Sequence, residues 1–150
     1  MNKVVLDTNV VFDLFFFDDA AARPLRLALE EGRMRCVVSD ATFDEWSRVL
    51  AYPEFGLDAI RQAALRERYR ALSSRQSIVA VDGLPRCSDP DDQKFLELAA
   101  ASGAGALVSK DRALLKLRRR CRPLFRVLTP AEAEDWLQAM AFSQALAAGT

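Results

Sequence analysis

Short apolar runs that end at a polar or acidic residue alternate with amphipathic segments along this chain. The apolar runs predict strands at residues 3–6, 35–38, 76–81, 106–108 and 125–128. The segments between them predict helices at residues 10–17, 24–31, 40–50, 57–73, 112–119 and 130–147, and a further helix that begins at Asp91 or Asp92 and ends before Gly103. Strands that alternate with helices favour a parallel sheet with helices on both faces. The predicted fold class is therefore α/β, a three-layer sandwich with a mainly parallel central sheet.

The length of 150 residues suits one domain, so we expect residues 1–150 to form a single unit. No apolar run approaches the roughly 20 residues that span a bilayer. The first apolar run meets Asp7 too early for a secretory signal. We therefore expect a cytoplasmic protein with no membrane partner.

The sequence contains no histidine. This excludes Ser-His-Asp and Cys-His triads, and it removes the histidine acid–base pair of metal-free ribonucleases and most zinc enzymes. The three cysteines, Cys36, Cys87 and Cys121, are far apart and form no Cys-x-x-Cys pair, which argues against a structural zinc site or a disulfide framework. An enzyme with this composition must use carboxylates, lysine, hydroxyls or a metal with oxygen ligands.

Two acids follow predicted buried strands. Asp7 ends the first strand directly, and Asp111 comes three residues after the strand at 106–108. In open parallel sheets, sites form beyond the carboxyl ends of the strands. For each acid the alternative is a helix N-cap, a position that Asp favours.

Other acids lie where helices are predicted. Asp89, Asp91 and Asp92 stand together at a helix start, which favours negative charge in any case, but three acids exceed what capping needs. Asp92 shares a helix side with the apolar positions that follow it, so we expect it to point inward. Glu45 lies at the border of the buried face of the helix at 40–50, although a lone Glu on a helix is usually just solvated.

Four carboxylates that converge without a cation would repel one another strongly. One or two hard divalent ions would convert Asp7, Glu45, Asp92 and Asp111 into an oxygen-ligand site. The sequence therefore predicts a carboxylate metal site at one edge of the sheet.

A run of basic residues without an intervening acid lies near the C-terminal third of the chain, although the net charge is zero. Such a strip can hold the phosphates of RNA. The alternative is a solvated helix face. The basic strip consists of Arg112, Lys116, Arg118, Arg119, Arg120, Arg122 and Arg126.

Four segments, in order, resemble the motifs of the PIN-domain family, and the resemblance runs from about residue 3 to 136. The first two are Val5-Leu6-Asp7-Thr8-Asn9-Val10-Val11 and the segment 39–50 with Glu45 before Trp46-Ser47-Arg48-Val49-Leu50. The third, Cys87-Ser88-Asp89-Pro90-Asp91-Asp92-Gln93-Lys94-Phe95, is similar to the branch that contains the toxin components of toxin–antitoxin pairs, the VapC-like ribonucleases. The fourth is Ser109-Lys110-Asp111-Arg112-Ala113-Leu114-Leu115.

This resemblance implies a Mg²⁺- or Mn²⁺-dependent endoribonuclease. The family's metal-binding and catalytic acids correspond to Asp7, Glu45, Asp92 and Asp111, with Asp89 and Asp91 as neighbours on the phosphate side. It implies further that RNA is the substrate, that the chain forms homodimers, and that a small antitoxin protein blocks the site. Supporting contacts to ligands or phosphate would come from Thr8, Asn9, Ser109 and Lys110.

Two alternatives stay open at this point. The family often has another Asp two residues after the fourth-motif acid, where this chain has Ala113, so a PIN-like fold that binds a partner without cleaving RNA is one alternative. The other is a phosphatase of the haloacid-dehalogenase type, with Asp7 as nucleophile. That family needs an Asp two residues further on, where this chain has Asn9.

Overall fold

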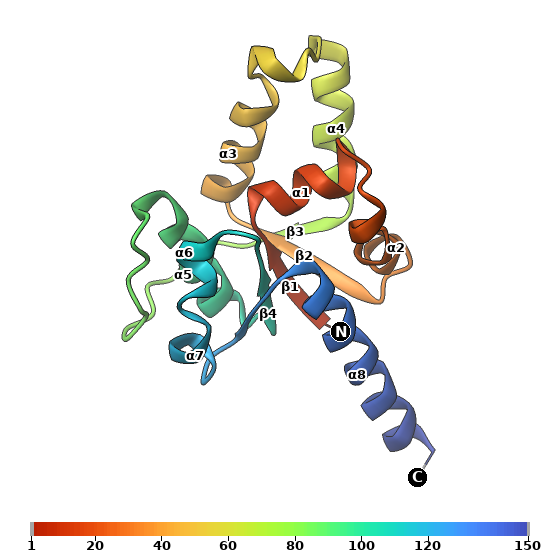
Figure 1. Ribbon diagram of the computed structural model, residues 1–150, viewed down its shortest axis with the longest axis vertical. Coiled ribbons are helices and arrows are strands. Elements are labelled where there is room, and N and C mark those ends of the chain that lie inside the picture. Colours follow the sequence, from red (N-terminus) through yellow and green to blue (C-terminus); the bar gives the residue numbers. More distant parts are fainter. Residues whose placement is uncertain (1, 150) are drawn as a thin grey trace.

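The computed structural model describes residues 2–149, and its centre is a five-stranded sheet in which every neighbouring pair is parallel (Figure 1). The strand order is β3-β2-β1-β4-β5. This confirms the predicted α/β class with a parallel central sheet. The strands are β1 (Asn2–Leu6), β2 (Met34–Val38), β3 (Ser73–Arg75), β4 (Ala106–Val108) and β5 (Arg126–Leu128).

Helices cover both faces of the sheet, which makes the three layers. The first group is α1 (Thr8–Phe15), α2 (Arg23–Glu30), α3 (Asp40–Leu50), α4 (Ala59–Ala71) and α8 (Pro130–Ala148), whose buried side chains share one core. The second group is α5 (Gln93–Ser102), α6 (Arg112–Leu115) and α7 (Arg118–Cys121), whose buried side chains form a core on the other face. Short 3-10 turns, η1 (Ala20–Ala22), η2 (Pro53–Phe55) and η3 (Pro90–Asp92), precede α2, α4 and α5.

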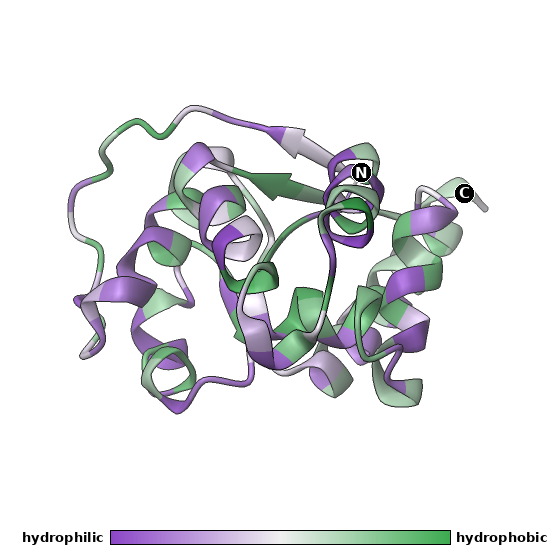
Figure 2. Cartoon of the chain, turned by 90° about the horizontal axis from the view of Figure 1, so that it is seen from above, coloured by the Kyte–Doolittle hydropathy of each residue, from purple (hydrophilic) through white to green (hydrophobic). Residues whose placement is uncertain are grey.

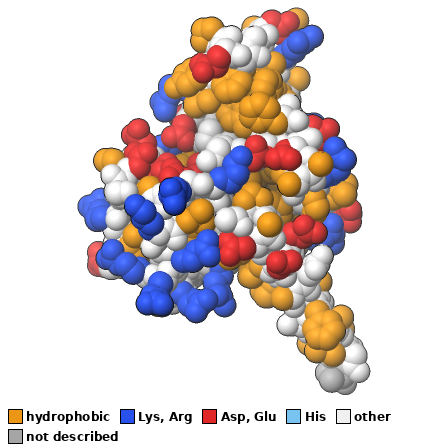
Figure 3. All heavy atoms as spheres, viewed as in Figure 1, with side chains coloured by type: hydrophobic (Ala, Val, Ile, Leu, Met, Phe, Trp, Pro, Cys, Tyr) orange, Lys and Arg blue, Asp and Glu red, His pale blue; other side chains and the backbone are white. Residues whose placement is uncertain are grey.

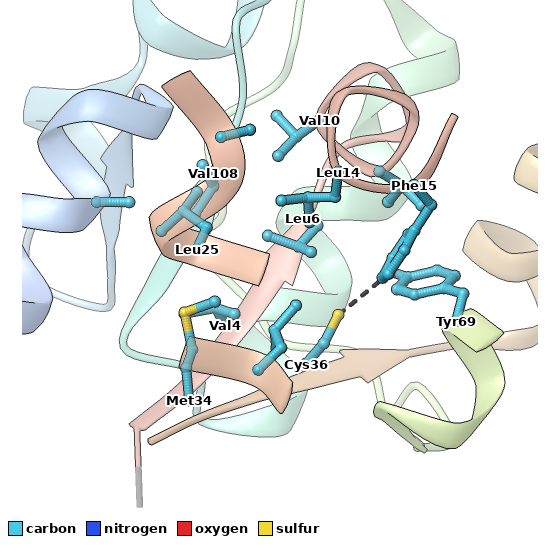
Figure 4. Close-up of a cluster of buried hydrophobic side chains, with 14 of the residues drawn as sticks. Val4, Leu6, Val10, Leu14, Phe15, Leu25, Met34, Cys36, Tyr69 and Val108 are labelled. Atoms are coloured by element: carbon cyan, nitrogen blue, oxygen red, sulfur yellow. Dashed lines mark hydrogen bonds between the residues drawn. The ribbon is translucent and has the colours of Figure 1, made fainter. Parts of the chain in front are cut away.

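The strands are apolar on both faces because both faces are covered. Val4 and Leu6 of β1 belong to the first core, whereas Val5 between them belongs to the second. Figure 4 shows the first core, where the buried Cys36 thiol and the Tyr69 hydroxyl lie 3.2 Å apart in a hydrogen bond. Burial of these side chains on both sides of β1 fixes the register of the strand, and with it the position of Asp7.

The strand predicted at residues 76–81 is wrong. The last strand contact of this segment is the N–H of Gln76, which donates to the Val38 carbonyl at 2.8 Å. The chain then leaves the sheet in an extended course (Figure 2), and Val79 is 72% exposed. The strand lies instead at the polar residues Ser73–Arg75, because β3 is an edge strand that needs little apolar surface.

The helix predicted at 112–119 is interrupted. It consists of α6 and α7, which are separated at Lys116 and Leu117. A capping box begins the last helix, because Thr129 and Glu132 each accept a hydrogen bond from the other's backbone N–H. From that cap α8 runs outward from the body of the molecule (Figure 1). Within residues 2–149, no helix has the length and apolar character to cross a membrane.

The parallel register brings the carboxyl ends of β1, β4 and β5 to one edge of the sheet. Leu6 pairs with Val108, and Val108 pairs with Leu128. The N–H of Asp7 continues this ladder to the Val108 carbonyl at 2.9 Å. Residues that directly follow β1 and β4 are therefore neighbours in space.

Candidate metal centre

Three aspartates from different parts of the chain meet at this edge of the sheet. Asp7 follows β1, Asp111 precedes α6 after β4, and Asp92 ends η3 before α5. One carboxylate oxygen of each lies within 4.8 Å of the others. Asp7 and Asp92 are buried, and Asp111 is half-buried. The structure thus gathers three of the four acids that the sequence singled out.

Ser109 connects two of these aspartates. Its hydroxyl donates to Asp7 Oδ2 at 2.6 Å and accepts the N–H of Asp111 at 2.9 Å. Asp7 occupies the N-cap position of α1 but makes no side-chain capping bond, so the helix-cap alternative does not account for its carboxylate. Asp111 does cap α6, because its Oδ1 accepts the N–H of Ala113 at 2.9 Å. For Asp111 the cap and the cluster are compatible.

Asp92 is the inward member of the acidic segment at 89–92. It is 8% exposed, and its Oδ2 has no hydrogen-bond partner within the described part of the chain. Asp89 instead caps the η3 turn, with Oδ1 accepting the Asp91 N–H at 3.0 Å, and Asp91 itself is exposed. Only Asp92 of this segment therefore offers a buried carboxylate to the cluster.

The protonation of the cluster reflects burial and crowding. Burial raises the pKa of Asp7 to about 6, against the lowering effect of the Ser109 hydrogen bond. Burial, and then the adjacent Asp111, raises the pKa of Asp92 to about 8. Hydrogen bonds from Asp92 and from the Ala113 N–H lower the pKa of Asp111. Without a cation, the cluster therefore keeps protons at neutral pH that isolated carboxyls would lose.

Glu45 lies beside the three aspartates but is held by other groups. Its carboxylate accepts a hydrogen bond from the Thr8 hydroxyl and pairs with the Lys94 ammonium at 2.5 Å. It lines the same cavity as Asp7 and Asp111. Glu45 is thus adjacent to the aspartate cluster, but its carboxylate does not contribute to the set of three oxygens that lie within 4.8 Å of one another.

The remaining supporting residues lie on the walls of this cavity. Thr8 and Asn9 line it, and the buried Oδ1 of Asn9 has no partner among the residues described. Lys110 also lines the cavity, where its ammonium pairs with Asp13 at 2.6 Å. The Lys110 charge is therefore partly neutralised before any phosphate arrives.

Sequence reasoning missed Lys94 and Asp13. Lys94 is half-buried, with its ammonium 5.4 Å from the centroid of the Phe95 ring. Its signal was a lone cation in the first turn of a helix that follows an acidic segment. Asp13 is 7% exposed, and its signal was a single acid within the apolar run at 10–17. Lys94 balances the charge of Glu45 at the cavity, and Asp13 balances the charge of Lys110.

The basic strip begins at Arg112, next to Asp111, and continues through α6 and α7 to the start of β5. All seven of its cations are exposed, and Figure 3 shows Lys and Arg gathered over the α6–α7 region. Arg118 is paired with Glu132 through two hydrogen bonds of 3.0 and 3.1 Å. A hollow of about 500 Å³ beside β5 is lined by Arg118, Arg119, Arg122, Arg126, Val127, Leu128 and Glu132.

The aspartate cluster fits a hard divalent cation. On an octahedral Mg²⁺ with bonds of about 2.1 Å, neighbouring ligand oxygens lie about 3.0 Å apart and opposite ones about 4.2 Å apart, so three oxygens within 4.8 Å of one another would reach one ion if the side chains moved closer together. The Oδ2 of Asp92 is buried without a partner, and the raised pKa values of Asp7 and Asp92 indicate that groups of the protein do not fully compensate their negative charge, so a divalent cation fits the cluster. The PIN-domain family often has another acid at the position of Ala113, so this chain lacks a carboxylate there. The Ala113 side chain packs against the second core instead.

Residues 3–113 match the family described as PIN domain. No curated protein sequence matches the chain. Among solved structures, the fold is similar to a chain in the crystal structure of VapBC2 from Rickettsia felis, in which VapBC2 is bound to a DNA fragment from its own promoter. The TM-score is 0.58 at 13% sequence identity, over 85% of this chain and 98% of that one. Because the family match covers most of its length, this chain belongs to the PIN domain family.

The raised pKa values predict how the stability of the metal-free protein depends on pH. Unfolded aspartates ionise near pH 4, whereas folded Asp7 and Asp92 keep their protons to about pH 6 and 8. The folded state therefore binds more protons between these limits, and the free energy of unfolding falls as the pH rises. We expect a lower melting temperature in EDTA at pH 8 than at pH 5.5.

Added Mn²⁺ should raise that melting temperature more at pH 8, where it competes with fewer protons. Asp92→Asn should flatten the pH dependence and reduce the Mn²⁺ effect, whereas Asp40→Asn, an exposed acid on α3, should alter neither. A melting temperature in EDTA that rises between pH 5.5 and 8 would contradict this assignment of buried, protonated carboxyls.

Proposed function

We propose that the chain is a Mg²⁺- or Mn²⁺-dependent endoribonuclease. The observation that carries the proposal is the meeting of Asp7, Asp92 and Asp111 within 4.8 Å, with a buried Asp92 oxygen left unpartnered. Membership of the PIN domain family supports the nuclease assignment. The absence of histidine from the sequence excludes the histidine acid–base pair of metal-free ribonucleases.

Asp7, Asp92 and Asp111 would hold the ion. When bound, it would supply positive charge that neutralises the scissile phosphate and lowers the pKa of the attacking water. Ser109 keeps one Asp7 oxygen engaged, which leaves the other oxygen available to a ligand. In-line attack of water would leave a 5′-phosphate and a 3′-hydroxyl.

Glu45 is the residue we assign to orienting the water. Its carboxylate is fixed by Thr8 and Lys94 on the cavity wall, so it has little freedom to turn away. The Asn9 side-chain amide would donate a hydrogen bond to a phosphate oxygen from the same wall, while the Thr8 hydroxyl keeps its bond to Glu45. The electrostatic potential around the RNA that enters the cavity would include contributions from Asp89, Asp91 and Lys110.

The basic strip is the surface we assign to the RNA backbone. Arg112, Lys116, Arg119 and Arg120 are exposed, and within residues 2–149 no acid forms an ion pair with them. Exposed, unpaired cations attract phosphates and release counterions when they bind. Arg118 would have to exchange its Glu132 partner for a phosphate.

We further propose that the chain is the toxin of a toxin–antitoxin pair. The third-motif segment resembles that branch of the family, and the fold is similar to a chain of a VapBC2 structure. The partner would be a small antitoxin protein that covers the carboxylate cavity. From the same resemblance we propose that the chain acts as a homodimer.

RNA cleavage is the direct test of the nuclease proposal. Purified protein should cut RNA with Mn²⁺ or Mg²⁺ and stop in EDTA. Asp7→Asn and Asp111→Asn should each lower the rate at least about 100-fold, because even groups one step removed from a metal account for 10- to 100-fold. Asp40→Asn, with an exposed carboxylate elsewhere, is the matched control and should cleave normally. Cleavage that survives EDTA, or that Asp7→Asn leaves unchanged, would refute the mechanism.

Salt dependence tests the basic strip. Cleavage efficiency, kcat/KM, should fall steeply between about 50 and 200 mM salt, because each phosphate contact adds roughly −0.7 to the log–log slope for single strands. Arg119→Ala and Arg120→Ala should each make that slope shallower by about this amount. Arg61→Ala, an exposed arginine on α4, serves as control. If the salt slope of all three variants equals that of the wild type, the basic strip is a solvated surface that does not bind the RNA backbone.

Growth of a bacterial host tests the toxin proposal. Induced wild-type protein should arrest growth, and Asp7→Asn should not. The proposal also predicts a short reading frame directly upstream of the gene, and its co-expression should restore growth. Immunoblotting must show equal amounts of the two proteins. Equal growth with wild type and Asp7→Asn would remove the toxin role and leave the nuclease proposal to the cleavage assay.

A further inference from the structure

Two of the clustered aspartates, Asp7 and Asp111, line a cavity of about 400 Å³ that has two chemically different ends. One end carries the carboxylates and polar groups already described. The other end is apolar and mainly aromatic, and neither the family's acidic motifs nor the mechanism uses it. This aromatic wall consists of Phe12, Phe17, Val49 and Phe55.

Phe17 is the exposed member of the aromatic wall. Its side chain is 59% exposed although it directly follows an apolar helix. Its ring centroid lies 4.9 Å from that of Phe16 and 6.5 Å from that of Phe55, with interplanar angles of 73° and 68°. These edge-to-face contacts hold the Phe17 ring in place while leaving much of it open to a ligand.

Phe55 supports the wall from η2. It stacks on Phe12 at 4.8 Å with an interplanar angle of 24°, and Phe12 is buried in the first core. The wall therefore rests on the folded core and is not a loose surface feature. Figure 3 shows hydrophobic side chains gathered above α1 between α3 and α4, on the face seen in Figure 1.

We propose that the Phe17 ring provides a stacking face, bordered by Phe55 in an edge-to-face contact, for an unpaired base of the RNA beside the scissile phosphate. This inference rests on the proposed nuclease function and narrows its substrate to single-stranded or looped RNA. Every base has an aromatic face, so stacking on Phe favours unpaired bases without reading a particular sequence. A base within a duplex is already stacked on its neighbours and is out of reach.

The shared cavity favours a nucleotide over a protein side chain. A nucleotide carries a phosphate and a flat ring in one residue, which matches a cavity with a carboxylate metal site at one end and phenyl rings at the other. An apolar side chain of a protein partner matches the aromatic end alone, and the proposed antitoxin would cover the cavity only when cleavage is blocked. The Lys110–Asp13 pair on the same cavity adds no net charge that would repel the ribose-phosphate chain.

The test is cleavage of a short single-stranded RNA by Phe17→Ala. Stacking of one base on an aromatic ring is worth about 5- to 150-fold, so kcat/KM should fall by that factor, mainly through a higher KM. Phe17→Trp, which keeps a stacking face, should restore most of it. Phe142→Ala is the matched control, because Phe142 is 66% exposed on the outer part of α8. Melting temperatures should be close to wild type, since both rings are mostly exposed.

Substrates with one abasic position identify the stacked base. With wild type, one abasic position near the cut should lower the rate as Phe17→Ala does, and Phe17→Ala should be insensitive to that position. Equal cleavage by wild type and Phe17→Ala overturns the inference and leaves the aromatic wall for a protein partner. If wild type cleaves no RNA, the nuclease proposal itself fails, which is a different result.

Discussion

The repulsion among three carboxylates at the end of a buried parallel sheet is the constraint on which the site depends. Asp7 and Asp111 are brought together because β1 and β4 are neighbours with parallel register, and Ser109 ties them. Apolar cores on both faces hold those strands, so the acids have no means of separating without disrupting the sheet. Protons on Asp7 and Asp92, or a divalent cation, must compensate the charge.

The acids around the cavity fall into two groups, those that are paired within the protein and those of the aspartate cluster. Glu45 forms an ion pair with Lys94 and accepts a hydrogen bond from Thr8, and Asp13 forms an ion pair with Lys110. The charges of these two flanking acids are therefore balanced within the protein. Among residues 2–149, Asp7, Asp92 and Asp111 form a cluster whose charge no ion pair balances. The exposed cations of the basic strip lie on α6, α7 and the segments that follow them.

The fold and the aspartates could be predicted because they follow local rules. Buried parallel strands read as short apolar runs, and acids at their carboxyl ends converge by topology. The edge strand β3 could not, since Ser73-Ser74-Arg75 carries no apolar signal and is defined by its pairing with β2. Nor could the partners of Glu45, because Lys94 reaches it from a different helix. The aromatic wall likewise depends on η2 returning to the end of α1.

The most direct measurement is a crystal structure of the protein grown with Mn²⁺, with anomalous differences recorded at the manganese absorption edge. The account predicts an anomalous peak about 2.0–2.6 Å from one oxygen each of Asp7, Asp92 and Asp111. No peak at that position in millimolar Mn²⁺, or aspartate side chains that turn away from one another, would contradict it.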